Sequence, residues 1–401
     1  MGFVRKFPDQ TKHKNSIFKI DHKNKLDLSY IPQRLPNREK HIKEIINQFK
    51  PVINGNTSSY IPILIHGSTG TGKTSSTKIA LDKIINDKNR SIVIKHVYVN
   101  CTIFGKTFLV VQQIAEKITS LPSRGLGEAE LFSKIYKELE TRDDYLILVL
   151  DDLDDLILND RGRLLYMITR LEEISEFTEK RLFIILIMRK QELLSLLDPS
   201  IISKIAGLKI PFNPYTWSEI KDIVKQRVEL AFIKDVISEN AIRQISFNGA
   251  YLSGGDARYP ISLLRRSGEV AIENSKKRIN VEDVRKAQQT MDDYMPHTLE
   301  TEMNKNSLSI LFKIITIFYR SQDTFSVKYD DILDILDEKE ENNFNVPKIN
   351  KKDVRESIEK ILDTGILQKS KRNLILSNLS AEFLYHKLRE IIGSHNSLST
   401  S

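Results

Sequence analysis

The sequence GSTGTGKT, residues 67–74, has the glycine spacing and the Lys-Thr ending of a phosphate-binding loop. It follows a short apolar run, residues 61–66, and precedes a helix-length segment that starts at Lys73. Glycines let the backbone turn so that successive N–H groups point at phosphate oxygens beside the positive end of a helix. An ordinary glycine-rich strand-to-helix turn is the alternative. The position between an apolar run and a helix favours nucleotide binding.

Within this loop each residue type has an expected partner. Lys73 suits the β and γ phosphates of ATP, and the Thr74 hydroxyl suits a magnesium ion. The residues expected to contact ATP or ADP are Gly67, Ser68, Thr69, Gly70, Thr71, Gly72, Lys73, Thr74 and Ser75.

Four carboxylates follow the apolar stretch LILVL within five positions: Asp151, Asp152, Asp154 and Asp155. They fit a solvated loop, an acidic helix start or a cation site. In phosphate-loop NTPases a second strand ends in an Asp that completes the magnesium site, and Asp151 is in that position. Asp152 then falls where many such ATPases place a Glu that orients the attacking water. Asp154 and Asp155 are expected in the polar first turn of the next helix, where carboxylates suit the dipole.

The elements that must position these residues follow from the hydrophobic pattern. Four apolar runs alternate with helix-length segments, which predicts an α/β class with a parallel sheet covered by helices. These runs are 61–66, 92–100, 146–151 and 182–188. Residues 214–295 carry apolar residues at three- and four-residue spacing, with no strand between them, which predicts a small helical domain.

A third region begins at about residue 307. Its pattern predicts three helices and then a hairpin, which is the element order of a winged helix. The expected elements are helices at 308–320, 329–338 and 351–365 and strands at 366–370 and 373–379. The tail from Gly393 is expected to be disordered.

Composition limits the class of protein. The 401 residues suggest two or three domains, and no apolar run approaches the roughly 20 residues of a membrane span. A single cysteine, Cys101, excludes an internal disulfide and fits a reducing cytosol. The net charge of +8 makes a polyanionic partner plausible. We therefore expect a soluble cytoplasmic protein, associated with the nucleoid if it binds DNA.

Several segments in this order resemble the archaeal origin-recognition initiators, AAA+ ATPases related to the eukaryotic origin recognition subunits and the helicase loader. The similar segments are YIPQRLPNREKHIKEI (30–45), YVNC (98–101), PSRGLGEAELF (122–132), LDPSIISKI (197–205), NPYTWSEI (213–220) and SGGDARYPISLLRRSGEVA (253–271). The resemblance implies a AAA+ base at 1–212 with an initiator-specific insert at about 103–126. It also implies a helical lid at 213–299 and a winged-helix domain at 300–395, which leaves 396–401 as the expected disordered tail.

The resemblance also implies roles for single residues. Arg258 in GGDAR resembles the sensor that reaches from the lid to the γ phosphate; a helix-start Arg in a surface salt bridge is the alternative. Pro32 and Tyr215 resemble neighbours of the adenine or ribose. The implied partners are double-stranded origin DNA, a paralogous initiator on the same origin and the replicative MCM helicase.

Three positions depart from the family pattern. Arg189 stands where the fourth strand should end in Asn, Ser200 stands where LDPRV would supply an arginine to a neighbouring subunit, and Asp152 replaces Glu. The shorter Asp moves its carboxylate back by one methylene, and an error of about 1 Å in position can lower a rate on the order of a hundredfold. We therefore expect nucleotide binding with slow hydrolysis at most.

In a winged helix the third helix enters the major groove and the hairpin tip contacts the adjacent backbone or minor groove. Val354, Ile358, Ile361 and Leu362 form the expected inner face of this helix, with Ser357 as a possible outward residue. The acidic stretch 330–343 is expected to face away from phosphates. The residues expected to contact DNA are Lys351, Lys352, Arg355, Lys369, Lys371, Arg372 and, in the insert, Arg124.

Two other classes stay open. A transcription regulator or signalling NTPase also joins a phosphate loop to a winged helix, but the GGDAR and PSRGL segments argue against it. A AAA+ remodelling motor fits poorly with Ser200 and Arg189.

Overall fold

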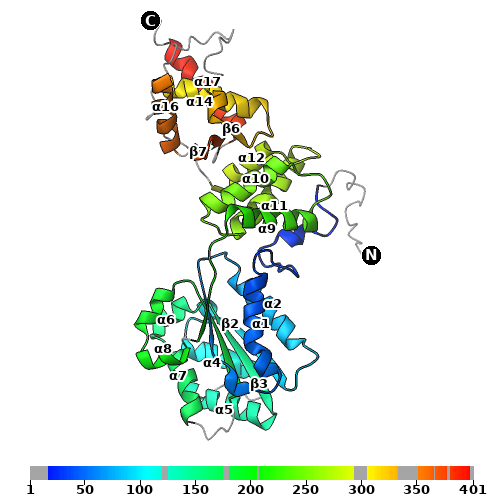
Figure 1. Ribbon diagram of the computed structural model, residues 1–401, viewed down its shortest axis with the longest axis vertical. Coiled ribbons are helices and arrows are strands. Elements are labelled where there is room, and N and C mark those ends of the chain that lie inside the picture. Colours follow the sequence, from blue (N-terminus) through cyan, green and yellow to red (C-terminus); the bar gives the residue numbers. More distant parts are fainter. Residues whose placement is uncertain are drawn as a thin grey trace, which may run out of the picture. The chain divides into compact units, whose positions relative to one another are not determined.

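The computed structural model describes residues 17–119, 125–174, 180–205, 207–292, 305–332, 351–364, 366–376 and 380–397. The chain divides into two compact units (Figure 1). Ile31–Tyr215 form the first, here called the sheet unit, and the residues up to Tyr30 join those from Thr216 onward in the second, the helical unit. In the described part of the chain, no helix is long and apolar enough to cross a membrane.

A five-stranded parallel sheet forms the centre of the sheet unit, with strand order β2-β3-β4-β1-β5. Every residue of β3 and β4 is buried, as expected for strands covered on both faces. The predicted four strands are present, and the short edge strand β5 is an addition. The strands are β1 (Ile63–His66), β2 (Val93–Asn100), β3 (Asp144–Asp151), β4 (Leu182–Met188) and β5 (Leu208–Pro211).

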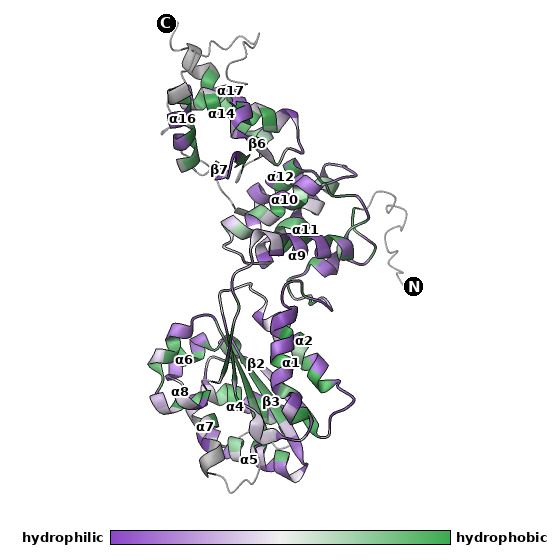
Figure 2. Cartoon of the chain, viewed as in Figure 1, coloured by the Kyte–Doolittle hydropathy of each residue, from purple (hydrophilic) through white to green (hydrophobic). Residues whose placement is uncertain are grey.

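Helices cover both faces of this sheet (Figure 1). Because successive strand residues point to opposite faces, Ile147 and Val149 pack with α1 and α2, whereas Leu146 and Leu148 pack with the helices of the other layer. Figure 2 shows the hydrophobic strands between amphipathic helices. The helices are α1 (Glu39–Ile53), α2 (Lys73–Ile85), α3 (Cys101–Phe104), α4 (Thr107–Ile118), α5 (Glu128–Thr141), α6 (Asp154–Asp160), α7 (Arg163–Ile174) and α8 (Pro199–Ile205).

The strand register brings the predicted site residues to one edge. His66 pairs with Met188, and Asn100 pairs with Asp151. The phosphate loop after β1, the carboxylates at the end of β3 and Arg189 after β4 therefore lie at the carboxyl edge of neighbouring strands. Ligands of open α/β sheets bind at this edge.

The helical unit begins with four helices, here called the lid, at the predicted positions: α9 (Trp217–Ala231), α10 (Glu239–Phe247), α11 (Arg258–Glu273) and α12 (Val281–Asp292). Thr216 caps α9 in a capping box with Glu219. Residues 17–30 pack against the lid. Phe18 forms an isolated β-bridge with Phe232, and Arg227 donates hydrogen bonds to the Lys25 and Tyr30 carbonyls.

The C-terminal domain packs helices around a small antiparallel sheet of order β6-β8-β7. The first and third predicted helices and the hairpin are present, and of the second only 329–332 lies within the described residues. Two elements were not predicted, β6 and the last helix, which continues through Ser397 where a disordered tail was expected from Gly393. The elements are α14 (Lys305–Arg320), β6 (Ser326–Lys328), α16 (Lys351–Asp363), β7 (Leu367–Ser370), β8 (Asn373–Leu376) and α17 (Ala381–Ser397).

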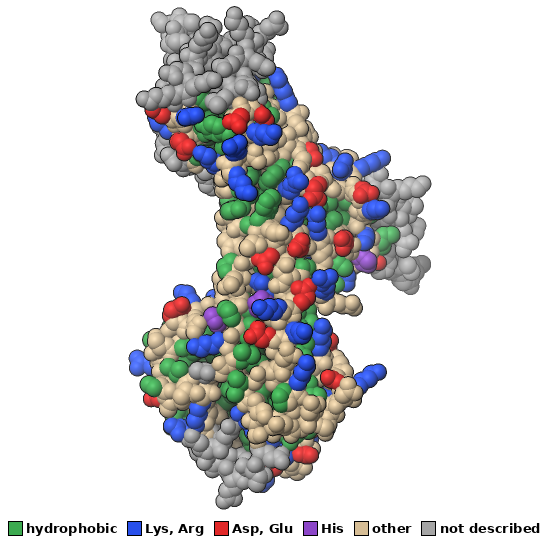
Figure 3. Space-filling view, viewed as in Figure 1, with side chains coloured by type: hydrophobic (Ala, Val, Ile, Leu, Met, Phe, Trp, Pro, Cys, Tyr) green, Lys and Arg blue, Asp and Glu red, His purple; other side chains and the backbone are tan. Residues whose placement is uncertain are grey.

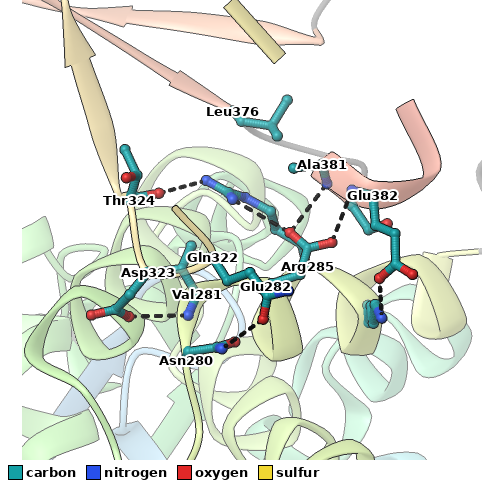
Figure 4. Close-up of polar contacts among 12 residues, drawn as sticks. Asn280, Val281, Glu282, Arg285, Gln322, Asp323, Thr324, Leu376, Ala381 and Glu382 are labelled. Atoms are coloured by element: carbon teal, nitrogen blue, oxygen red, sulfur yellow. Dashed lines mark hydrogen bonds and ion pairs between the residues drawn. The ribbon is translucent and has the colours of Figure 1, made fainter. Parts of the chain in front are cut away.

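Buried polar contacts join the lid to the C-terminal domain (Figure 4). The Glu282 carboxylate of α12 accepts hydrogen bonds from the backbone N–H groups of Ala381 and Glu382, both 3.2 Å, at the start of α17. Arg285, fully buried, lies 3.5 Å from Glu282 and donates to the Thr324 carbonyl at 2.9 Å. These contacts satisfy the N–H groups that a helix start leaves unpaired.

Candidate functional site

The phosphate loop turns from β1 into α2 with glycines where a side chain cannot fit. Gly67 and Gly72 have φ of 147° and 89°. A Cβ on Gly67 would lie 2.2 Å from the Phe212 carbonyl oxygen, and one on Gly72 would lie 2.6 Å from the Tyr215 hydroxyl. Both positions therefore require glycine, because of the backbone angle and because of the close neighbour.

Lys73 is folded back over this loop. Its ammonium group donates to the carbonyls of Gly67 at 2.6 Å and Ser68 at 2.8 Å, and the residue is buried. The Thr71 hydroxyl also donates to the Ser68 carbonyl, at 2.8 Å. The loop thus holds a positive charge at a helix start, the arrangement that suits phosphate oxygens.

Thr74 and Asp151 lie close enough to share one cation. The Thr74 hydroxyl donates to Asp151 Oδ2 at 2.7 Å, and the Tyr98 hydroxyl also donates to Oδ2. Asp151 Oδ1 accepts the backbone N–H of Asp152 at 2.9 Å. A hydroxyl and a carboxylate at this spacing are the oxygen ligands that magnesium prefers beside phosphate.

Asp152 is displaced from the strand by a left-handed backbone, with φ of 53°. Its Oδ2 accepts a hydrogen bond from the Asn100 amide at 3.1 Å. Burial raises the pKa of Asp152, and the neighbouring Asp151 charge raises it further. A carboxyl group that binds a proton more readily, next to a cation site, is suited to accept a proton from water.

Asp154 and Asp155 open α6, as predicted, but their carboxylates have specific partners. Asp154 is buried and accepts the backbone N–H groups of Arg189 at 2.8 Å and Lys190 at 2.9 Å. Asp155 accepts the Thr102 hydroxyl at 2.7 Å. Asp154 therefore fixes the chain after β4 to the start of α6, instead of being a solvated first-turn carboxylate.

Of the two departures outside this cluster, Arg189 is exposed and Ser200 is half-buried. The Arg189 guanidinium, 42% exposed, pairs with Asp155 at 3.4 Å and lies 3.7 Å from Asp154. Ser200, near the start of α8, donates its backbone N–H to Asp198 at 2.7 Å.

The remaining residues predicted to contact nucleotide belong to both units. In the sheet unit, Pro32 and Tyr215 are buried, and Tyr215 lies against the phosphate loop. In the helical unit, Arg258 begins α11 and forms a bidentate ion pair with Asp256. The shortest distance, between Arg258 Nη2 and Asp256 Oδ2, is 3.0 Å. The surface salt bridge is therefore present, and the sensor role stays a prediction.

Four of the predicted DNA contacts are exposed on α16 and the hairpin: Arg355, Lys369, Lys371 and Arg372. Lys371 has φ of 57° at the hairpin turn. The expectation for Ser357 was wrong, because it is only 5% exposed and lies on the inner face with Ile358. The side chains of Lys351 and Lys352, the whole of Arg124 and most of the acidic stretch lie outside the described residues.

Three residues of this site were missed in the sequence: Arg38, Tyr98 and Asn100. Tyr98 and Asn100 alternate along the end of β2 with buried Val97 and Val99, and this polar alternation beside the Asp151 strand was the available signal. Arg38 carries no comparable signal, because its partners are backbone carbonyls at Thr71 and Asn213.

Comparison with known proteins agrees with this architecture. Residues 58–197 match the AAA domain family, and residues 221–289 match the Cdc6 AAA+ ATPase-type lid domain. A solved structure of Cdc6p from Pyrobaculum aerophilum shares the fold over 95% of this chain and 100% of that chain, with a TM-score of 0.77 and 22% identity. The Aeropyrum pernix ORC1 protein, solved in complex with DNA, has a TM-score of 0.58 and 22% identity over 94% of this chain and 97% of its own.

Curated relatives are more similar in sequence. ORC1-type DNA replication protein 2 of Saccharolobus solfataricus is 32% identical over 285 residues, which are 70% of this chain and 69% of that protein. ORC1-type DNA replication protein 1 of Sulfurisphaera tokodaii is 30% identical over 71% of this chain and 70% of its own. The chain therefore belongs to the ORC1-type family of DNA replication proteins.

Proposed function

We propose that the chain is an ATP-dependent switch in replication initiation, which binds double-stranded origin DNA and helps to load the replicative helicase. The observation that carries the nucleotide role is the cluster of Lys73, Thr74 and Asp151 at the carboxyl edge of the sheet. Lys73 and the loop N–H groups would bind the phosphates of ATP or ADP, and Thr74 and Asp151 would hold Mg²⁺. Arg258 would contact the γ phosphate from the lid.

Hydrolysis is proposed to be slow. Asp152 is one methylene shorter than the usual Glu, and its carboxylate is held by Asn100. Arg189, which pairs with Asp155, stands where the family pattern has an Asn. The neutral amide of that Asn would help to position the attacking water, and a guanidinium does not replace it. Both features support binding of ATP without efficient attack by water, because a small error in position is enough to lower the rate.

DNA binding is assigned to α16, to the β7–β8 hairpin and to the insert in the sheet unit. Figure 3 shows Lys and Arg side chains among Asp and Glu side chains on the drawn face of the C-terminal domain, so this domain is not uniformly basic. Specific positions must therefore make the contacts. Lys371 and Arg372 at the hairpin turn and Arg355 on α16 are the exposed candidates.

Unequal roles with a second initiator are part of the proposal. Ser200 carries no charge that could complete a neighbour's ATP site from the start of α8. The chain would therefore receive such a residue but not supply one. A paralogous initiator at the same origin, followed by the MCM helicase, is the proposed order of partners.

Nucleotide binding tests this proposal directly. Titration with a fluorescent ATP analogue in the presence of Mg²⁺ should saturate for wild type and for Lys83→Ala, an exposed lysine on the same helix α2. Lys73→Ala should weaken binding by about a hundredfold, since a buried charge-assisted contact to phosphate is lost. Equal affinity of Lys73→Ala and Lys83→Ala would exclude the proposed phosphate site.

The DNA role needs its own measurement. Footprinting on chromosomal fragments should give protection at origins. The double variant Lys371→Ala, Arg372→Ala should lose protection at the bases that the hairpin turn contacts. Protection confined to promoters would instead indicate a transcription regulator.

A further inference from the structure

The segment 212–215, which joins β5 to α9, lies along the phosphate loop and contacts both of its ends. The Phe212 carbonyl lies against Gly67, and the Tyr215 hydroxyl lies against Gly72. The Phe212 N–H also donates to the His66 carbonyl at 2.7 Å. A movement of the loop toward this segment at Gly67 or Gly72 would therefore displace it.

Arg38 ties the middle of the same segment to the loop. Its Nε donates to the Thr71 carbonyl at 2.8 Å, and its Nη2 donates to the Asn213 carbonyl at 2.8 Å. The residue is 3% exposed, although it carries a charge. A planar guanidinium fixes both donors in one rigid fork, so the two carbonyls are held at a constant separation.

The guanidinium is also stacked on aromatic rings of the segment. Its central carbon lies 3.8 Å from the centre of the Tyr215 ring and 5.4 Å from that of Phe212. No carboxylate in the described part of the chain pairs with Arg38, so carbonyl dipoles and ring faces alone compensate its charge. The position of this cation therefore depends on the loop and the segment together.

Helix α1 holds the segment at a second point. His41 Nε2 lies 3.2 Å from the Pro211 carbonyl oxygen, and its ring lies 4.5 Å from that of Phe212. Arg38 immediately precedes this helix. The fork is therefore anchored on a packed element, as a group that transmits a small displacement must be.

We propose that Arg38 is a positioning residue that couples nucleotide occupancy of the phosphate loop to the stiffness of segment 212–215, the connection into the first lid helix. This inference rests on the nucleotide binding proposed above. Phosphate oxygens draw the loop N–H groups toward them and order the peptide units to which the Thr71 carbonyl belongs. The guanidinium passes that order to Asn213, whereas a lysine ammonium, as a point charge on a flexible stem, cannot hold two carbonyls in one geometry.

Hydrogen–deuterium exchange of a peptide covering 212–216 tests the coupling, with and without saturating ADP and Mg²⁺. In wild type, nucleotide should slow exchange at these amides by roughly fivefold or more. Arg38→Lys should still bind nucleotide, within about tenfold of wild type, but the nucleotide-dependent slowing should disappear. Arg34→Lys, an exposed arginine nearby, is the matched control and should behave as wild type.

A second variant removes the aromatic ring on which the guanidinium is stacked, so that the Arg38 fork is no longer held in one position. Tyr215→Leu should reduce the nucleotide-dependent slowing of exchange while Arg38 keeps its charge. This variant keeps the test valid if Arg38→Lys does not fold. Full nucleotide-dependent slowing in either variant would overturn the role of Arg38. If wild type binds no nucleotide in the same titration, the proposed function itself fails, and this outcome is distinct from binding without coupling.

Discussion

The four carboxylates after β3 have four different environments, and each environment limits what the carboxylate does. Asp151 accepts two hydroxyls and Asp154 accepts two backbone N–H groups, so both are fixed. Asp155 is shared between Thr102 and Arg189 at the surface. Asp152 combines a raised pKa with a place beside the cation site. It is therefore the residue at which a change should alter hydrolysis rather than folding.

We predict that Asp152→Glu raises the rate of ATP hydrolysis in single-turnover assays, on the order of tenfold, because the extra methylene returns the carboxylate toward the attacking water. Asp152→Asn should lower it, since the amide cannot accept the proton. Asp82→Glu on the exposed side of α2 is the control and should leave the rate unchanged. A slower Asp152→Glu enzyme with normal ATP affinity would show that reach is not what limits this site.

Magnesium dependence should belong to Asp151. Asp151→Asn keeps an oxygen that can accept from Thr74 and Tyr98, while the charge and the acceptor of the Asp152 N–H are lost. The Mg²⁺ concentration for half-maximal ATP binding should rise by about ten- to a hundredfold, and chelation should abolish the difference between the variants. Asp82→Asn serves as the control. An unchanged Mg²⁺ titration for Asp151→Asn would place the cation elsewhere.

At the scale of elements, two ion pairs lie at the junction of α12 and α17 (Figure 4). One pair is buried and the other is partly exposed. Glu282 and Arg285 are 3% and 0% exposed, and burial lowers the pKa of Arg285 to about 10. Lys286 and Glu382, 31% and 43% exposed, form the neighbouring pair. Removing one partner of a buried pair leaves an uncompensated charge, which an exposed pair does not.

Glu282→Ala is therefore predicted to destabilise the helical unit by about 3–5 kcal/mol. The substitution leaves the buried Arg285 without its carboxylate partner and removes the acceptor of the N–H groups at the start of α17. Lys286→Ala should cost under about 1 kcal/mol. Urea unfolding followed by fluorescence of Trp217, the single tryptophan, reports this unit, because Trp217 stacks 6.4 Å from Phe325. Equal midpoints for the two variants would contradict a structural role for the buried pair.

How much of these elements could be predicted depends on how continuous their burial is. The strands β3 and β4 are buried at every residue, so their apolar runs stand out in the sequence. Strand β5, LKIP, buries only Ile210 at the sheet edge, and β6 has three residues with one buried. Short edge strands leave no apolar run, and their pairing is decided by tertiary contacts.

The candidate site could be predicted where a motif fixes local geometry and not where distant backbone groups meet. The loop 67–74 and Asp151 follow from strand-to-helix context. The partners of Asp154 and Arg38 are main-chain groups 35 and 175 residues away in sequence, respectively. A carbonyl or N–H group has no residue identity, so no pattern of side chains could indicate these contacts.

At the scale of the whole molecule, a net charge of +8 provides general attraction to DNA without choosing a surface. The hairpin turn is predicted to supply specific phosphate contacts through Lys371 and Arg372. Replacing both with Ala should lower the slope of log affinity against log salt by about 1.8, since each phosphate contact contributes about 0.9. Replacing Lys40 and Lys43, exposed on α1, removes the same charge and should leave the slope nearly unchanged. Because the two variants have equal net charge, equal slopes would mean that general attraction, and not the hairpin, holds the DNA.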